Sequence, residues 1–162
     1  MAQQVTPSAV VATMEELHGY FIEDLDVGMT DVYVRTVTET DIVQYSQISG
    51  DDNPLHVNEE FAKQTVFKGR IAHGMLTCGY ISSVLGTKLP GPGCAYLNQN
   101  LTFRAPVRIG DTVQTRVTIK DIDPNTNKVT CEAVCSIGEK VVIDGSATLW
   151  VPNRRKKDEK AV

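Results

Sequence analysis

The feature that most constrains the fold is an almost uncharged run from His73 to Leu89. Its apolar side chains fall all around a helical wheel: Met75, Leu76, Cys78, Tyr80, Ile81, Val84 and Leu85. A helix that is apolar on every side is a buried helix. Glycine costs a helix about 1 kcal/mol relative to alanine, and we expect close packing against a sheet to explain Gly79 and Gly86. The run therefore predicts a central helix that is covered by other elements.

The chain after this run has the pattern of a sheet. Pro90-Gly91-Pro92-Gly93 breaks the helix, and residues 94–105, 112–122, 128–138 and 140–150 read as strands separated by turn signals. In the first of them, Leu97, Gln99, Leu101 and Phe103 alternate with polar residues, which predicts a half-buried antiparallel strand. One buried helix against an antiparallel sheet is an α+β layer arrangement.

The chain before the run supplies a strand and two helices. Residues 30–37 are rich in Val, Thr and Tyr, which favours a strand. Thr38 with Asp41 forms a weaker version of a capping box, and the helix that it starts ends at Gly50. Asn58 can cap a second, short helix, and residues 65–72 are expected to be irregular. Asp51 therefore lies just past a helix end, on a loop.

Length and composition indicate a single soluble domain. The 162 residues suit one domain, for which we expect the bounds 19–152. Residues 1–18 are expected to form a poorly ordered arm, and residues 153–162 a charged tail. The net charge of −4 argues against nucleic-acid binding, and the basic run 154–157 is followed at once by Asp158 and Glu159, as in a solvated tail.

Cysteine usage and hydropathy point to the cytoplasm. The four cysteines, Cys78, Cys94, Cys131 and Cys135, form no CxxC pair and no zinc-finger spacing, so reduced thiols are the simplest interpretation. The N-terminus lacks the basic and apolar regions of a secretory signal. No segment approaches the length of apolar chain that spans a membrane.

The residues best suited to chemistry lie in the stretch from Ser49 to His56. Pro54 fixes its own φ and pushes Asn53 into an extended conformation, so the loop is stiff. A carboxylate (Asp51) and an imidazole (His56) on such a loop can divide proton removal from proton donation. The same residue types also favour an ordinary turn. From these residues alone, the two interpretations are about equally supported.

A family resemblance changes that balance. Residues 45–62, Tyr-Ser-Gln-Ile-Ser-Gly-Asp-Asp-Asn-Pro-Leu-His-Val-Asn-Glu-Glu-Phe-Ala, resemble the hydratase 2 motif of the MaoC-like (R)-specific enoyl-CoA hydratases. The resemblance extends to residues 73–76, to 96–97 and to 103–107 with Gly110-Asp111. It spans most of residues 20–151, which makes it far more specific than a short pattern.

The resemblance implies a fold and a set of site residues. The fold is the hot dog fold, a long helix wrapped by an antiparallel sheet, which usually pairs into homodimers. The family's catalytic pair corresponds to Asp51 and His56 in this sequence. Its nearby active-site serine corresponds to Ser82, and its glycine at the helix start corresponds to Gly74. Asp52 occupies a variable position of the motif, and we interpret it as facing solvent.

The implied reaction is hydration of a trans-2-enoyl thioester to an (R)-3-hydroxyacyl thioester. We expect His56 to take a proton from a water that Asp51 orients, and Asp51 to supply the proton for Cα, although a coupled pair leaves the reverse division open. Free N–H groups at the helix start, near Gly74, would stabilise the thioester oxygen. Ser82 could bond the carboxylate or the water, or equally its own carbonyl at i−4.

Other residues are weaker candidates for substrate binding. Asn53, His73, Leu85 and Arg104 are expected near the substrate, and His73 is expected mainly to shape the helix start. Lys68, Arg70, Lys88 and Arg104 are candidates for the CoA phosphates, and Leu85 and Val84 for limiting the acyl chain, which we expect to be short. No metal or cofactor is expected, because CoA is part of the substrate and no ligand constellation is visible.

Three alternatives remain from the sequence. The nearest is 3-hydroxyacyl-[acyl-carrier-protein] dehydratase, which performs the same chemistry on another carrier. The second is a hot dog acyl-CoA thioesterase, against which the Asp51–His56 spacing argues. The third is an acyl-CoA-binding domain without activity. Absence of Asp51 or His56 from the sequence would have favoured this interpretation, and both are present. Supply of polyhydroxyalkanoate precursors, acyl-CoA assimilation and β-oxidation-like routes would all use the hydratase reaction.

Overall fold

The structure is a computed structural model, and it describes residues 12–154. Most of the expected arm and tail lies outside these residues. Within the described part of the arm, Met14–Leu17 form the short helix α1. Thr13 and Glu16 form a capping box at its N-terminus. A single turn of 3₁₀ helix, Ile22–Asp24, follows.

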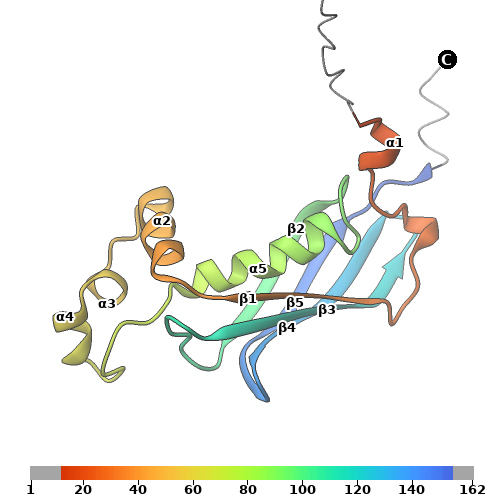
Figure 1. Cartoon of the computed structure of the whole chain (residues 1–162). Helices are drawn as coiled ribbons and strands as arrows, with labels where there is room; N and C mark the ends of the chain where they lie inside the picture. The colour runs from red at the N-terminus through yellow and green to blue at the C-terminus, as the bar shows by residue number, and fades with distance from the viewer. Residues whose placement is uncertain (1–11, 155–162) are drawn as a thin grey trace, which may run out of the picture.

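The sheet has five antiparallel strands in the order β1-β3-β4-β5-β2. Their bounds are Thr30–Thr36 for β1, Ala95–Phe103 for β2, Thr112–Asp123 for β3, Lys128–Ile137 for β4 and Lys140–Trp150 for β5. The long helix α5, Gly74–Thr87, lies along one face of the sheet (Figure 1). The predicted α+β hot dog architecture is confirmed.

Helix α5 is buried on one side only. Its inward side is formed by Thr77, Tyr80, Ile81, Val84 and Leu85, which pack over β1, β3 and β4. Met75, Gly79, Ser82 and Gly86 are exposed on the other side. The prediction of a helix covered all round is therefore wrong for the single chain. So is the expected reason for Gly79 and Gly86, since a Cβ at either position would meet nothing within 4 Å.

Strand β2 also differs from its prediction. It is an edge strand bonded only to β5, and eight of its nine residues are exposed. Because α5 covers the opposite half of the sheet, neither face of β2 is buried within the chain, although its alternation predicted one buried face. Tyr96, Leu97 and Phe103 remain exposed by 42%, 51% and 53%. An unpaired edge with exposed apolar side chains is the kind of feature that often marks an interaction surface.

Three helices between β1 and α5 form a separate group beyond one end of the sheet (Figure 1). They are α2 (Glu39–Ser49), α3 (Pro54–Val57) and α4 (Glu59–Lys63), and we call residues 39–72 the overhanging segment. The predicted capping box of Thr38 and Asp41 is confirmed, and Gly50 ends α2 with a left-handed φ of 75°. Helix α3 was not predicted; Pro54 lies at its first turn and Asn53 caps it.

The start of α2 is anchored to the sheet by an ion pair. Arg35 of β1 binds the carboxylate of Asp41, which also accepts from the backbone N–H and the hydroxyl of Thr38 at 2.8 Å each. Burial opposes ionisation of this carboxyl, but the bonds from Arg35 and Thr38 hold its pKa below the usual value. The start of α2 is thus fixed relative to β1.

Candidate active site

A cavity of about 510 Å³ opens between the overhanging segment, the start of α5 and residues 103–107. Its polar lining consists of Asp51, His56, His73, Thr77 and Arg104. The rest is mostly apolar and includes Phe67, Ile71, Phe103, Pro106 and Ile143. The cavity therefore offers a few polar groups within an apolar wall, as ligand sites commonly do.

Backbone bonds on both sides of Pro54 shape the loop that carries Asp51. The N–H of Asp51 lies 3.2 Å from the Ser49 hydroxyl, and its carboxylate accepts from the N–H of Asn53 at 3.3 Å. The Asn53 side chain in turn caps α3 by accepting from the N–H of Leu55 at 3.0 Å. Asn53 does not line the cavity, so the structure gives it a capping role where substrate contact was expected.

His56 is held in one tautomer by the backbone. Its Nδ1 lies 2.9 Å from the carbonyl oxygen of Ile71, and the side chain is buried. A carbonyl oxygen only accepts, so Nδ1 carries the hydrogen of this bond and Nε2 of the neutral ring keeps its lone pair. His56 is thereby a ready proton acceptor at Nε2.

His73 is held by the loop that carries Asp51. Its Nε2 donates to the backbone carbonyl of Asp51 at 2.9 Å, while its Nδ1 is buried without a partner among the described residues. Burial lowers the pKa of His73 below the ordinary value, so the ring stays neutral. His73 also begins α5 as its N-cap residue. Its side chain makes no capping bond to α5, and its hydrogen bond goes to the Asp51 backbone instead.

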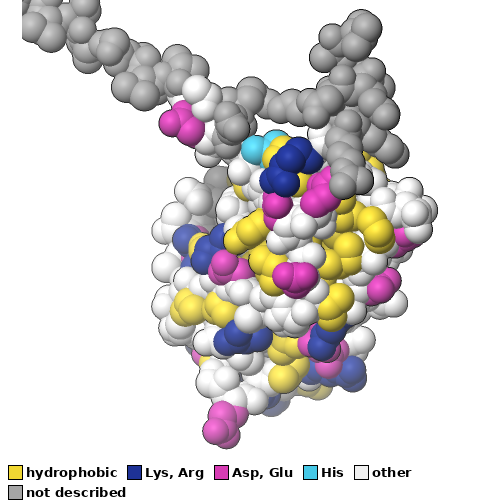
Figure 2. All heavy atoms as spheres, turned by 90° about the vertical axis from the view of Figure 1, so that its right-hand side faces the viewer, with side chains coloured by type: hydrophobic (Ala, Val, Ile, Leu, Met, Phe, Trp, Pro, Cys, Tyr) yellow, Lys and Arg dark blue, Asp and Glu magenta, His cyan; other side chains and the backbone are white. Residues whose placement is uncertain are grey.

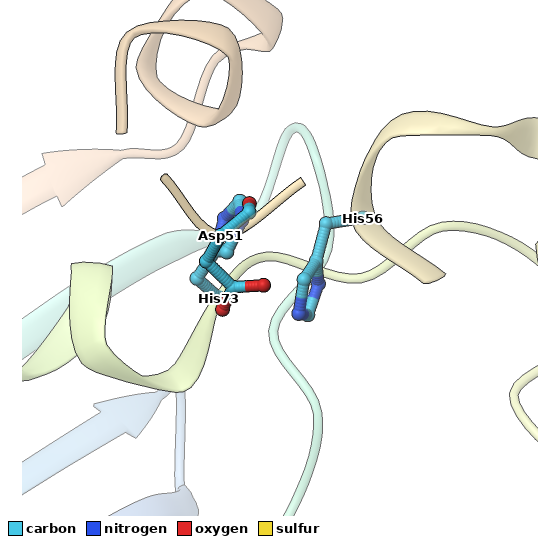
Figure 3. A group of neighbouring side chains, drawn as sticks. All are labelled: Asp51, His56 and His73. Carbon is cyan, nitrogen blue, oxygen red and sulfur yellow. The ribbon is translucent and has the colours of Figure 1, made fainter. Parts of the chain in front are cut away.

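The three side chains meet at one point. One carboxylate oxygen of Asp51 and one ring nitrogen from each of His56 and His73 lie within 4.8 Å of one another. Figure 3 shows the Asp51 carboxylate pointing toward the ring of His56, with His73 beside it. The rings of His56 and His73 have centroids 3.9 Å apart. A water between Asp51 and His56 would have an acceptor on each side.

The same trio is the one candidate ligand set for a metal ion among residues 12–154. Two imidazoles and a carboxylate are ligands that divalent transition metals accept. That the reaction needs no metal thus stays a prediction, and a measurement of activity after metal removal tests it.

The start of α5 supplies backbone donors to the cavity. No acceptor within the described chain bonds the N–H groups of Gly74 and Met75, as expected for the first residues of a helix. Phe103 approaches Gly74 so closely that a Cβ there would lie 2.6 Å from Cε1 of the ring. A side chain at this position would therefore have to displace the Phe103 ring, which the sequence did not reveal.

Two expected site residues lie elsewhere. Ser82 is on the exposed side of α5 and does not line the cavity with Asp51 and His56. Leu85 is fully buried in the core and, like Val84, does not line the cavity. Ile143 and Phe103 form apolar wall where Leu85 and Val84 were expected to limit the acyl chain.

The basic residues proposed for CoA phosphates differ in how they are engaged. Arg70 binds Glu39 and the carbonyl of His56, and Lys88 binds Asp31 and the carbonyl of Val32. Arg104 lines the cavity and pairs with Asp144 at 3.1 Å. Lys68 is exposed beside the cavity residue Phe67. Arg104 is thus the one of the four that lines the cavity.

Thr77 is a cavity residue that the sequence did not bring to attention. It lies in the apolar run and lines the cavity with its hydroxyl buried. The available signal was its spacing, since Thr77 follows Gly74 by three residues and so shares its helix face.

On the face in Figure 2, basic and acidic side chains are interspersed among apolar ones, with no extended basic area. No helix among the described residues is both long and apolar enough to cross a membrane.

Comparison with known proteins gives the family. Residues 26–140 match the model of the MaoC-like domain. The (R)-specific enoyl-CoA hydratase of Rhodospirillum rubrum is 50% identical over 140 residues, covering 86% of this chain and 97% of that protein. The 3-hydroxybutyryl-CoA dehydratase of Methylorubrum extorquens is 44% identical over 149 residues, covering 92% of this chain and 95% of that protein.

A solved structure is similar over the same region. R-hydratase PhaJ1 from Pseudomonas aeruginosa, in the unliganded form, superposes with a TM-score of 0.78 at 36% identity, over 83% of this chain and 86% of that one. The resemblance drawn from residues 45–62 and the later strands is therefore correct. The chain belongs to the MaoC-like domain family.

Proposed function

We propose that this protein is an (R)-specific enoyl-CoA hydratase, a hydro-lyase that interconverts trans-2-enoyl-CoA and (R)-3-hydroxyacyl-CoA. The observation that carries the proposal is the meeting of the Asp51 carboxylate with the buried imidazole of His56 in an apolar cavity. The relatives named hydratase and dehydratase match this chain over nearly their whole length. Short acyl chains, such as crotonyl-CoA, are the proposed substrates.

The chemistry follows from the bonds of the two side chains. A water between them donates one hydrogen to Nε2 of His56, whose Nδ1–H is already bound to the Ile71 carbonyl. The water oxygen adds to Cβ, and Asp51 supplies the proton for Cα. The proton on His56 then returns to Asp51, which lies within reach, so that protons balance over a turnover.

The thioester oxygen gains negative charge as the water adds. The free N–H groups at the start of α5 provide fixed donors for it, and they need no reorganisation during the reaction. The apolar wall excludes competing water and strengthens these bonds. These groups together account for the reaction without a metal or a separate cofactor.

We infer that the working protein is a homodimer. The open side of α5 and the apolar edge strand β2 are both exposed in the single chain. Pairing β2 of two chains would extend the sheet and cover both features. The four cysteines are free thiols, which fits the proposed cytoplasmic location.

Crotonyl-CoA hydration tests the function directly. Absorbance of the conjugated thioester should fall, and chiral analysis should give the (R)-3-hydroxy product. Asp51→Asn and His56→Ala should each lower kcat/KM by about 10³-fold or more while the fold is retained. Asp52→Asn is the matched control, because Asp52 is the exposed neighbour outside the cavity, and it should remain near wild type.

Two further measurements separate the alternatives. Release of free thiol from the acyl-CoA would identify a thioesterase instead. Faster turnover of the acyl-carrier-protein thioester than of the CoA thioester would identify the carrier-protein dehydratase. Near-normal hydration by Asp51→Asn or His56→Ala would refute the proposed mechanism.

A further inference from the structure

Thr77 holds a buried hydroxyl that the fold does not use. The residue is 1% exposed and lines the cavity, and its Oγ1 finds no hydrogen-bond partner among the described residues. Leaving a buried hydroxyl unpaired destabilises a folded protein. Because the unpaired hydroxyl belongs to a cavity-lining residue, a bound ligand can provide the missing hydrogen-bond partner.

The usual partner of a helical threonine is already occupied. Threonine in a helix commonly bonds the carbonyl four residues earlier, as Thr87 does on the same helix by donating to the Ser83 carbonyl at 2.6 Å. For Thr77 that carbonyl belongs to His73, and it already accepts from the N–H groups of Leu76 and Thr77 at 3.2 and 3.5 Å. The hydroxyl is thus left without a partner on its own helix.

The position of Thr77 matches the place where substrate charge develops. It lies one turn after Gly74 on the same helix face, and both residues line the cavity. Gly74 offers a free backbone N–H at the helix start. A hydroxyl beside this N–H can donate to the same oxygen, and donors to a developing oxyanion are stronger in an apolar surrounding.

We propose that Thr77 is a further catalytic residue, whose hydroxyl donates a hydrogen bond to the thioester oxygen of the substrate beside the Gly74 N–H. This inference rests on the proposed hydratase function and adds a side-chain donor to it. Because the bond strengthens as the oxygen becomes negative, Thr77 acts on the transition state more than on the bound substrate. The ligand class is an α,β-unsaturated acyl thioester.

The clean test is Thr77→Val, which replaces the hydroxyl by a methyl group of similar size. We expect kcat for crotonyl-CoA hydration to fall by about 10- to 100-fold, with KM changed less than about threefold. The thermal midpoint should stay equal to or rise above that of wild type, because an unpaired buried hydroxyl is removed. Thr77→Ser keeps the hydroxyl and should retain most of kcat.

Thr115→Val is the matched control. Thr115 is also fully buried, but it lies in β3 outside the cavity and its hydroxyl is within 3.4 Å of the Cys135 Sγ. This variant should keep wild-type kcat. A Thr77→Val enzyme with wild-type kcat, or one that loses activity only in step with a lowered thermal midpoint, would overturn the proposal.

A binding measurement decides the point independently of turnover. The absorption of 2,4-hexadienoyl-CoA moves to longer wavelength when its carbonyl oxygen is polarised by hydrogen bonds. In an Asp51→Asn background, which prevents hydration, the shift on binding should be smaller when Thr77 is also changed to valine. An equal shift in both variants refutes the role of Thr77. If instead wild type fails to hydrate crotonyl-CoA, the proposed function fails, and the shift still reports on Thr77.

Discussion

Nε of Arg70 lies 2.5 Å from the carbonyl oxygen of His56. The same guanidinium binds both carboxylate oxygens of Glu39 at 2.9 and 3.0 Å, so Arg70 joins the start of α2 to the end of α3. Only 14% of the Arg70 side chain is exposed, and its donors are directed at the protein. Arg70 was expected to bind CoA phosphates, and its contacts make it a positioning residue for His56.

Arg70→Gln tests this role by its effect on kcat and KM. Loss of the bond to the His56 carbonyl should loosen α3 and lower kcat by about tenfold, since small misplacements of a catalytic group are costly. A phosphate-binding role would instead raise KM for CoA thioesters. Lys88→Gln is the control, because Lys88 is bound to β1 and lies outside the cavity lining. A raised KM with unchanged kcat in Arg70→Gln would disprove the positioning role.

A dimer through β2 and α5 predicts the effect of a charge on the open side of the helix. Gly79→Glu should shift the protein from dimer to monomer, because a Cβ at Gly79 meets nothing in its own chain and would have to face the partner. Light scattering after size exclusion measures the mass. Val27→Glu places the same charge at a side chain that is 63% exposed in the loop before β1, and this variant should stay dimeric. A dimeric Gly79→Glu protein would exclude this interface.

The hydratase should work without a metal ion. Asp51, His56 and His73 could in principle hold one, so the prediction is tested at the catalytic centre itself. We expect prolonged dialysis against a chelator to leave kcat unchanged, because the proton transfers use only protein groups and water. Recovery of activity only after addition of Zn²⁺ or another divalent ion would contradict a mechanism in which Asp51 and His56 alone transfer the protons.

His73 predicts how stability depends on pH. Burial lowers its pKa in the folded protein below the ordinary value of 6.5. Below about pH 6.5 the unfolded chain therefore binds a proton that the folded protein does not, so the free energy of unfolding falls as pH falls. The fall should end below the folded pKa of the ring.

Urea unfolding at about pH 7.5 and about pH 5.5 measures this contribution. His73→Gln removes the titrating ring, so its free energy of unfolding should decrease less between the two pH values than that of wild type. His18→Gln is the comparison, because His18 is the histidine outside the cavity and is only partly buried. Equal decreases in wild type and His73→Gln would show that His73 does not cause the dependence.

The sequence predicted most of the fold because its signals are local. Helix ends are marked by residues that act on the neighbouring backbone and need no distant partner. Examples are the capping box of Thr38 and Asp41, the glycine at Gly50 and the break at Pro90–Gly93. The helix α3 escaped notice because it has only one turn, stabilised by Asn53 and by packing of the overhanging segment. The motif brought Asp51 and His56 to attention through resemblance, whereas their residue types alone left a simple turn equally well supported.

Burial was harder to predict than secondary structure. An apolar side chain gives the same signal whether its cover comes from its own chain or from another, so Met75 and β2 read as core and are exposed. The pair of Arg70 with Glu39 and the approach of Phe103 to Gly74 each join residues more than 25 positions apart, and no local pattern contains them. Thr77 was missed because its one signal, the three-residue spacing from Gly74, does not stand out within an apolar run.

The overhanging segment has a consequence for how such a protein can change its chemistry. Its link to the rest of the chain includes the Arg35–Asp41 pair and the bonds of Arg108 to the carbonyls of Phe67 and Arg70. Both proposed proton-transfer groups lie on this segment, while the thioester donors lie on α5. Recognition of the thioester and its reaction are thus encoded in separable stretches of sequence. Exchange of residues 39–72 would therefore replace the proton-transfer groups while leaving the backbone donors of α5 in place.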